Sequence, residues 1–275
     1  MPLSEPSVHA RRATRARELA ERYPASAEPL RFIAAVVDEQ ARLEKHIAPF
    51  PSPRQAAEAA HIRADPAGMV AKLAQHSRPL IELVLREGPP PLRDVAQRLN
   101  EAGCREALDR FLRLEDTTSP GSFFARVLLQ GLWASRPAHS GDASSEREPR
   151  TSSPPTSSCP GCGHAPQLGV VHPIGDGSEL RLMCSLCLRQ WSFSRQQCAA
   201  CGESEEKRIA YYGADEKLPH LKVRVCESCL RYLVQVELMK EPKAVPDIDE
   251  MAALPLDVWA TGRGLRKLHP NLFGI

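Results

Sequence analysis

Apolar residues recur at every third or fourth position through the first half of the chain. Between residues 30 and 47 they form one stripe, made by Phe32, Ile33, Val36, Val37, Leu43 and Ile47. This spacing places them on one face of a helix and predicts that the face is buried. Similar stripes continue as far as Leu132. The pattern predicts an α-helical domain over residues 1–134.

Proline and glycine punctuate these stripes. Pro79, the Gly-Pro-Pro-Pro run at 88–91 and Gly103 each interrupt the helical spacing and predict breaks between helices. The connections are short, which favours neighbouring helices packed in a compact bundle.

A polar segment follows the helical half. Residues 135–158 contain eight Ser and four Pro among 24 residues, so almost nothing there can be buried. The composition predicts a Ser/Pro-rich linker.

The pattern then changes to short β-prone runs between cysteine pairs, and the change occurs twice. CPGCG and LRLMCSLCLRQWSF form the first copy; CAACG and LKVRVCESCLRYLVQV form the second. Each copy fits a hairpin between two metal-binding turns, as in a zinc ribbon. We therefore predict tandem units over residues 159–197 and 198–240, and a C-terminal helix and tail over 241–275 that packs on the rest. The predicted class is α+β and multidomain.

Eight of the nine cysteines form four C-x-x-C pairs: Cys159/Cys162, Cys184/Cys187, Cys198/Cys201 and Cys226/Cys229. A two-residue spacer lets both sulfurs reach one ion from a tight turn. Four such pairs predict two four-thiolate metal sites more readily than four separate redox dithiols. The spacing alone does not choose between iron and zinc, because four thiolates suit either ion.

The internal repeat bears on which pairs share an ion. It favours sequential pairing, with Cys159, Cys162, Cys184 and Cys187 in site 1 and Cys198, Cys201, Cys226 and Cys229 in site 2. A cross-braced arrangement, which joins the first pair to the third and the second to the fourth, stays open. Joining the two middle pairs would break the repeat.

Composition and charge narrow the function classes. The chain begins without an apolar signal segment and has no apolar run long enough to cross a membrane, so we expect a cytoplasmic protein with reduced thiols. Residues 159–240 carry ten Lys and Arg against nine Asp and Glu. With eight thiolates and two divalent ions the module becomes acidic, which opposes binding to a phosphate backbone. A zinc-ribbon nucleic-acid or transcription-associated binding protein is therefore the alternative rather than the first choice.

No phosphate loop, nucleophile elbow or His-Glu-x-x-His motif is present, and closed four-thiolate sites leave no position for substrate, so we expect no enzyme.

Several other residues that could carry chemistry are expected to have structural roles. We expect Cys104 to be a packed thiol, His164 and His220 not to be metal ligands, and Trp191 and Tyr232 to pack in the core. The Arg11–Arg17 cluster is predicted to be a solvated helix face. Arg195 lies at the junction of the two units, either solvated or in contact with the neighbouring site.

The cysteine region resembles the formate dehydrogenase accessory protein family, FdhE. The resemblance rests on CPGCGHAPQLGVV, on CSLCLRQWSFSRQQCAACG with Trp191 and Arg195 between its pairs, on CESCLRYL, and on the ending DIDEMAALPLDVWATGRGLRKLHPNLFG. A looser match covers RARELAERYPASAEPLRFIAAVVDEQ near the start.

The resemblance implies a cytoplasmic, non-enzymatic maturation factor that binds the catalytic subunit of respiratory formate dehydrogenase. It implies a helical domain followed by two rubredoxin-like sites whose ligands are the eight paired cysteines. It favours two iron ions per chain, with zinc as the alternative, and a mainly structural role for them, with electron transfer as a further possibility.

Overall fold

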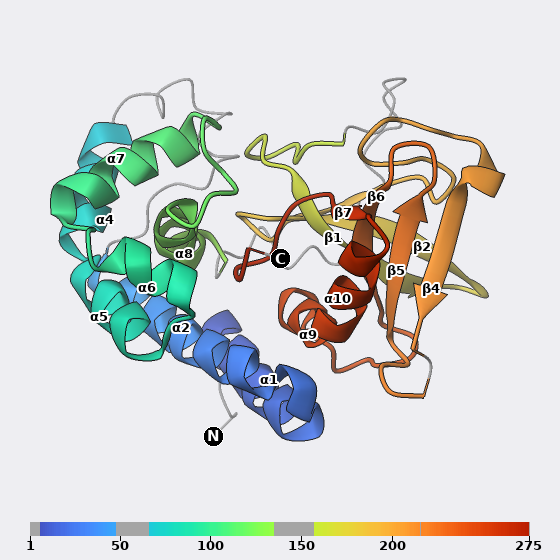
Figure 1. Cartoon of the computed structure of the whole chain (residues 1–275), viewed down its shortest axis with the longest axis horizontal. Helices are drawn as coiled ribbons and strands as arrows, with labels where there is room; N and C mark the ends of the chain where they lie inside the picture. The colour runs from blue at the N-terminus through green and yellow to red at the C-terminus, as the bar shows by residue number, and fades with distance from the viewer. Residues whose placement is uncertain (1–5, 48–65, 135–156, 215, 275) are drawn as a thin grey trace.

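The computed structural model describes residues 6–47, 66–134, 157–214 and 216–274. Helices of the first half lie on one side of the molecule and a β-sheet lies on the other (Figure 1). Two C-terminal helices, α9 (Pro246–Ala252) and α10 (Leu254–Gly262), lie between them. The predicted linker over 135–158 falls outside the described residues except for its last two positions.

Seven α-helices make up the described part of the helical region, and the stripes seen in the sequence form their buried faces. They are α1 (Val8–Arg22), α2 (Ala27–His46), α4 (Pro66–Gln75), α5 (Arg78–Glu87), α6 (Pro90–Ala96), α7 (Glu101–Leu112) and α8 (Ser122–Trp133).

Proline and capping residues set most of the helix boundaries. Pro79 lies in the first turn of α5, and Gly88 ends that helix, as the sequence predicted. The break predicted at Gly103 is wrong, because Gly103 lies inside the first turn of α7. The Asn100 side chain accepts a hydrogen bond from the Gly103 N–H at 2.9 Å and so caps the helix three residues earlier.

Helix α8 is the centre of the helical region, and all of its residues are buried. Phe123 stacks on Phe32 of α2 with ring centroids 6.1 Å apart. The same helix buries two polar residues, Arg126 and Gln130, on the side that faces the sheet. Burial of a polar side chain requires partners. Ser185 and Gln167 of the cysteine region supply some of them, and Gln130 also accepts hydrogen bonds from Arg12 and Gln40.

The cysteine region forms one seven-stranded sheet. Its strands are β1 (Pro166–Ile174), β2 (Gly177–Cys184), β3 (Gln190–Ser192), β4 (Ile209–Gly213), β5 (Leu221–Cys226), β6 (Arg231–Glu237) and β7 (Arg266–Lys267). The order is β3-β2-β1-β6-β5-β4, with β7 beside β6.

Two three-stranded antiparallel units correspond to the two copies of the sequence repeat. Strands β1, β2 and β3 form the first, and β4, β5 and β6 form the second. A parallel pairing of β1 with β6, in which Leu168 lies opposite Val234, joins them into one sheet. Because one sheet extends across both units, the boundaries at 159–197 and 198–240 stay a prediction.

The predicted α+β class is confirmed: a helical region precedes a sheet that carries two clusters of four cysteines. Among the described residues, no helix is both long and apolar enough to cross a membrane.

Candidate metal centres

All four C-x-x-C turns have the same local backbone. The N–H of the first cysteine bonds to the carbonyl five residues later in three of them, for example Cys159 to His164 at 2.9 Å and Cys198 to Glu203 at 2.7 Å. In the fourth turn, Cys226 pairs with Arg231 in the β5–β6 ladder. The repeat in the sequence thus reflects four copies of one tight turn.

The residue after the second cysteine adopts a left-handed backbone in every turn. Gly163 and Gly202 have φ near 78°, and Leu188 and Leu230 have φ of 57° and 56°. Glycine adopts this conformation freely, whereas a leucine there is strained by contact of its Cβ with the backbone. The sequence shows the two glycines, but nothing in it marks the two leucines as members of the same set.

Site 1 contains Cys159, Cys162, Cys184 and Cys187. The sulfur of Cys162 lies 3.3 Å from that of Cys184 and 3.7 Å from that of Cys187. Cys159 and Cys187 are also 3.7 Å apart. The N–H groups of Gly161 and Leu186 point at the sulfurs of Cys159 and Cys184 at 3.4 and 3.3 Å.

Site 2 contains Cys198, Cys201, Cys226 and Cys229. The sulfurs of Cys198 and Cys229 lie 3.8 Å apart, and those of Cys201 and Cys226 lie 3.7 Å apart. The N–H of Ala200 donates to the Cys198 sulfur at 3.3 Å. The structure therefore groups the eight cysteines sequentially, first pair with second and third with fourth.

These distances fit a tetrahedral ion. Four sulfurs at about 2.3 Å from one centre lie roughly 3.8 Å from one another, whereas a disulfide would bring two of them to about 2.0 Å. Burial raises the pKa of Cys184 and of Cys198, so a nearby cation is needed to hold these sulfurs as thiolates. Both clusters thus have the donors, spacing and electrostatic requirement of a metal site.

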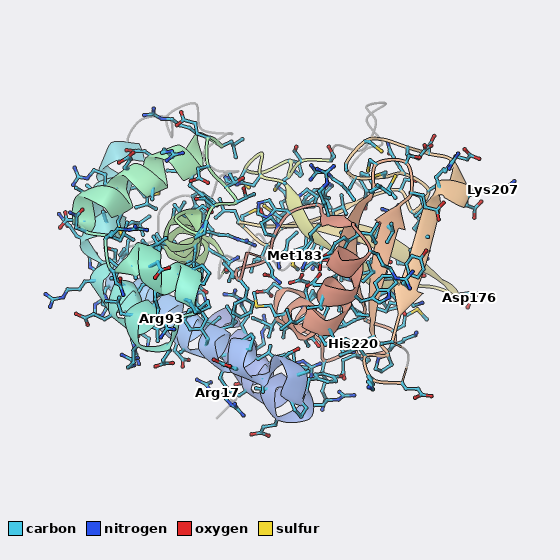
Figure 2. All side chains as sticks on the ribbon, viewed as in Figure 1. Arg17, Arg93, Asp176, Met183, Lys207 and His220 are labelled. Atoms are coloured by element: carbon cyan, nitrogen blue, oxygen red, sulfur yellow. The ribbon has the colours of Figure 1, made fainter. Side chains whose placement is uncertain are left out.

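The two sites differ in what surrounds them. All four cysteines of site 1 belong to or pack against the main hydrophobic core, which includes the helical region. Three cysteines of site 2, Cys198, Cys226 and Cys229, form a separate small cluster with Ile209, and Cys201 is exposed. Figure 2 shows Met183, the residue before Cys184, in the middle of the molecule, whereas Lys207, just before β4, lies at its margin.

Helices α7 and α8 contact the turns of site 1 directly. The guanidinium of Arg126 donates to the Ser185 carbonyl at 2.9 Å, to the Pro270 carbonyl at 2.9 Å and to the side chain of Gln167. The His164 ring stacks on Phe111 of α7 with centroids 4.8 Å apart. Burial lowers the pKa of Arg126 to about 10, so the group stays charged near neutral pH.

A buried ionic network holds α9 between the helical region and the sheet. Arg12 donates to Asp247 at 2.8 Å, and Arg15 donates to Asp249 at 2.5 Å. His220 of the sheet side also contacts Asp249, at 2.9 Å. The predicted solvated face over Arg11–Arg17 is therefore wrong in part: Arg12 and Arg15 are 1% and 7% exposed because α9 supplies carboxylates that hydrophobic patterning does not reveal.

A second buried group lies between α9, α10 and β7. Lys267 donates to Glu250 and, at 2.9 Å, to Asp257, and Tyr232 donates to Asp257 at 2.9 Å. Burial raises the pKa of Glu250, and the Lys267 ammonium opposes that rise. The acidic residues of DIDEMAALPLD are thus internal partners rather than surface charge.

The remaining candidates occupy ordinary positions. Cys104 is buried, and burial raises its pKa, as expected of a packed thiol. Tyr232 is buried and Trp191 is half-buried against the core, as predicted. Arg195 is exposed and donates to Ser178 at 2.6 Å. The sequence missed Arg224, which is buried at the joint and donates to the carbonyls of Arg195 and Gln197 at 2.9 and 2.7 Å.

Two family models match consecutive parts of the cysteine region. Residues 158–195 match the FdhE central domain, and residues 196–273 match the FdhE C-terminal domain. Together they contain both clusters.

Curated relatives carry the name "Protein FdhE homolog". The protein from Aquifex aeolicus is 33% identical over 117 residues, 42% of this chain and 41% of the relative. The protein from Pseudomonas putida is 34% identical over 157 residues, 54% of this chain and 46% of the relative. These alignments span less than half of the length of either relative. The protein from Haemophilus influenzae aligns over 97% of this chain and 89% of its own length at 27% identity.

A solved structure, the crystal structure of the FdhE protein from Pseudomonas aeruginosa, has the same fold. It superimposes with a TM-score of 0.68 and covers 98% of both chains at 24% identity. The structural likeness shows the shared fold, and the two domain matches with the curated relatives show that the chain belongs to the FdhE family.

Proposed function

We propose that the protein is an accessory factor for the biogenesis of respiratory formate dehydrogenase and that it binds the catalytic subunit of that enzyme. Family membership supports this role. The observation that carries it is the joining of a helical region and a metal-binding sheet by buried ion pairs, with one cysteine cluster at the junction. Such a body is rigid, and rigidity reduces the entropic cost of holding a partner.

The cysteine clusters support a binding role rather than catalysis. Each offers four sulfurs, which fill a tetrahedral ion and leave no position for a substrate. The buried carboxylates and bases of the ionic network are occupied by one another rather than facing a cleft. We assign the chain a non-enzymatic function in the cytoplasm.

We propose two metal ions per chain, held by site 1 and site 2, with iron favoured and zinc as the alternative. The ions hold the four turns together, since sheets of this size with few aromatic residues gain much of their stability from bound metal. Metal analysis of the purified protein tests this. Two ions per chain are expected, and one ion or none would contradict the assignment.

Affinity capture tests the proposed role. The tagged full chain is expressed in cells that make formate dehydrogenase, and the recovered proteins are identified. We expect enrichment of the catalytic subunit over capture with a tagged unrelated rubredoxin. Recovery of nucleic acid without the subunit, or no recovery of the subunit, would overturn the proposal and favour the alternative class.

A further inference from the structure

Strand β4 forms one edge of the sheet, and no other described strand pairs with its outer side. The carbonyl of Arg208, just before β4, accepts a hydrogen bond from the N–H of Glu227 at 2.9 Å. Ladder bonds in an antiparallel pair are made by alternate residues. Starting from Arg208, the residues whose backbone groups bond to β5 are therefore Ala210 and Tyr212. The N–H and C=O groups of the residues between and after them, Tyr211 and Gly213, point away from β5. This edge can accept another strand.

Aromatic and aliphatic side chains are exposed next to this edge. Tyr211 and Tyr212 are 44% and 40% exposed, and Val258 of α10 is 62% exposed. The ring of Tyr212 contacts that of Trp259, with centroids 4.9 Å apart. We call Tyr212, Val258, Trp259 and Arg263 the edge patch. The Tyr211 side chain lies on the opposite face of β4, where its hydroxyl accepts a hydrogen bond from Arg224 at 3.3 Å. In Figure 1, β4 lies on the side of the molecule away from the helical bundle of α4–α8, and α10 lies between that bundle and the outer strands of the sheet.

The charge beside the edge patch is positive. The guanidinium of Arg263 lies over the Trp259 ring at 4.7 Å from its centroid, which holds the charge in place. Residues 258–266 contain Arg263 and Arg266, both exposed, and no acidic residue. The nearest acid in sequence, Asp257, is buried and bound to Lys267 and Tyr232. A carboxylate on a ligand would therefore meet an uncompensated cation.

We propose that the edge patch docks an extended, acidic segment of a partner polypeptide, which adds to β4 as a further strand. The backbone of the segment bonds to the outward groups of Tyr211 and Gly213. One of its apolar side chains packs on Tyr212 and Trp259, and one of its carboxylates meets Arg263. The identity of the partner as the catalytic subunit of formate dehydrogenase rests on the proposed function. The binding chemistry of the edge does not depend on that proposal.

A model peptide tests the surface by itself. The probe is a fluorescein-labelled octapeptide of alternating Glu and Val, and the comparison is the same peptide with Lys in place of Glu. Both are titrated with the full-length protein and followed by fluorescence anisotropy. We expect the Glu peptide to bind at least about tenfold more tightly than the Lys peptide, because like charges next to Arg263 disfavour the latter.

Four variants, two for charge and two for the backbone, separate these contributions. Arg263→Glu should weaken binding of the Glu peptide about fivefold or more, whereas Arg93→Glu, on exposed α6 at the opposite end of the molecule, should not (Figure 2). Tyr211→Pro should bind about fivefold more weakly than Tyr211→Ala. Both lose the ring, but proline alone removes the outward N–H, and a proline is tolerated at such an edge position.

Two results would overturn the docking surface. The first is equal binding of the two peptides. The second is that Arg263→Glu leaves binding of the Glu peptide unchanged and that Tyr211→Pro binds it as well as Tyr211→Ala does. Capture of the catalytic subunit is measured separately with the same variants. If the wild-type protein does not capture the catalytic subunit, the proposed function is refuted. The peptide titrations still test the docking surface in that case. Capture that persists in Arg263→Glu would show that the subunit uses another surface.

Discussion

The local stability of the helical region should depend on an intact site 1 and not on an intact site 2. The perturbation is Cys184→Ser, which removes one of four thiolates from site 1, compared with Cys226→Ser, which does the same at site 2. Opening the Cys184–Cys187 turn would free the Ser185 carbonyl that accepts the charged hydrogen bond of Arg126. It would also loosen the His164 ring that stacks on Phe111.

The magnitude follows from those two contacts. A hydrogen bond to a charged group contributes about 1.5–3 kcal/mol, and an aromatic pair contributes about 0.5–1.5 kcal/mol. Together they predict that α8 loses about 3 kcal/mol of local stability in Cys184→Ser, which corresponds to roughly a hundredfold faster exchange of its amide protons. Site 2 has no such contacts with the helices among the described residues, so the change there should stay below about 0.5 kcal/mol.

Hydrogen–deuterium exchange read by mass spectrometry on peptides from α8 measures the effect. Metal content is determined on the same samples, and each variant should keep one ion. The reasoning would be refuted by equal loss of α8 protection in the two variants, or by unchanged protection in Cys184→Ser after loss of its ion.

Three further predictions test the network, the turns and a buried base. Arg15→Ala should lower the free energy of unfolding by about 3–5 kcal/mol, because it removes the guanidinium that pairs with buried Asp249. The control Arg17→Ala, which breaks an exposed pair with Asp38, should lower it by less than about 1 kcal/mol. Urea titrations measure both variants, and similar losses would argue against the network. Leu230→Gly should raise the free energy of unfolding by about 1 kcal/mol, because glycine adopts the left-handed backbone at this position without steric strain. Leu230→Ala keeps a Cβ atom and therefore the strain, so it should give no such gain. A gain in both variants would point to another cause. Burial lowers the pKa of His269 to about 3 from 6.5, so the unfolded chain binds this proton first as the pH falls, and stability is lost below about pH 6.5. Between pH 6 and pH 5 that loss is about 1.2 kcal/mol, because about nine-tenths of the unfolded histidine carries the proton in this range. His269→Asn should remove this component from the pH dependence of unfolding, and an unchanged dependence would show that His269 is not its source.

Local patterns in the sequence predicted most of the architecture. The stripe from Phe32 to Ile47 marks the buried face of α2, and the repeated C-x-x-C units correspond to the two three-stranded halves of the sheet. Both signals depend on residues close together in the chain, where spacing alone determines which face or turn they share.

Contacts between distant segments could not be read in this way. Arg12 and Asp247 are separated by 235 positions, and each taken alone looks like a surface charge. The parallel β1–β6 pairing that fuses the two units likewise joins Leu168 to Val234 without a sequence signal. Leu188 and Leu230 show the same limit at short range, because a strained leucine in place of glycine is visible only in the backbone angles.

Direct binding between purified components tests the central claim most closely. The full-length protein, with its metal quantified, is mixed with purified catalytic subunit of formate dehydrogenase and analysed by size-exclusion chromatography with light scattering. We predict a complex that contains both chains and retains two ions for each accessory chain. Separate elution of the two proteins at micromolar concentration, with both metal sites filled, would contradict the account.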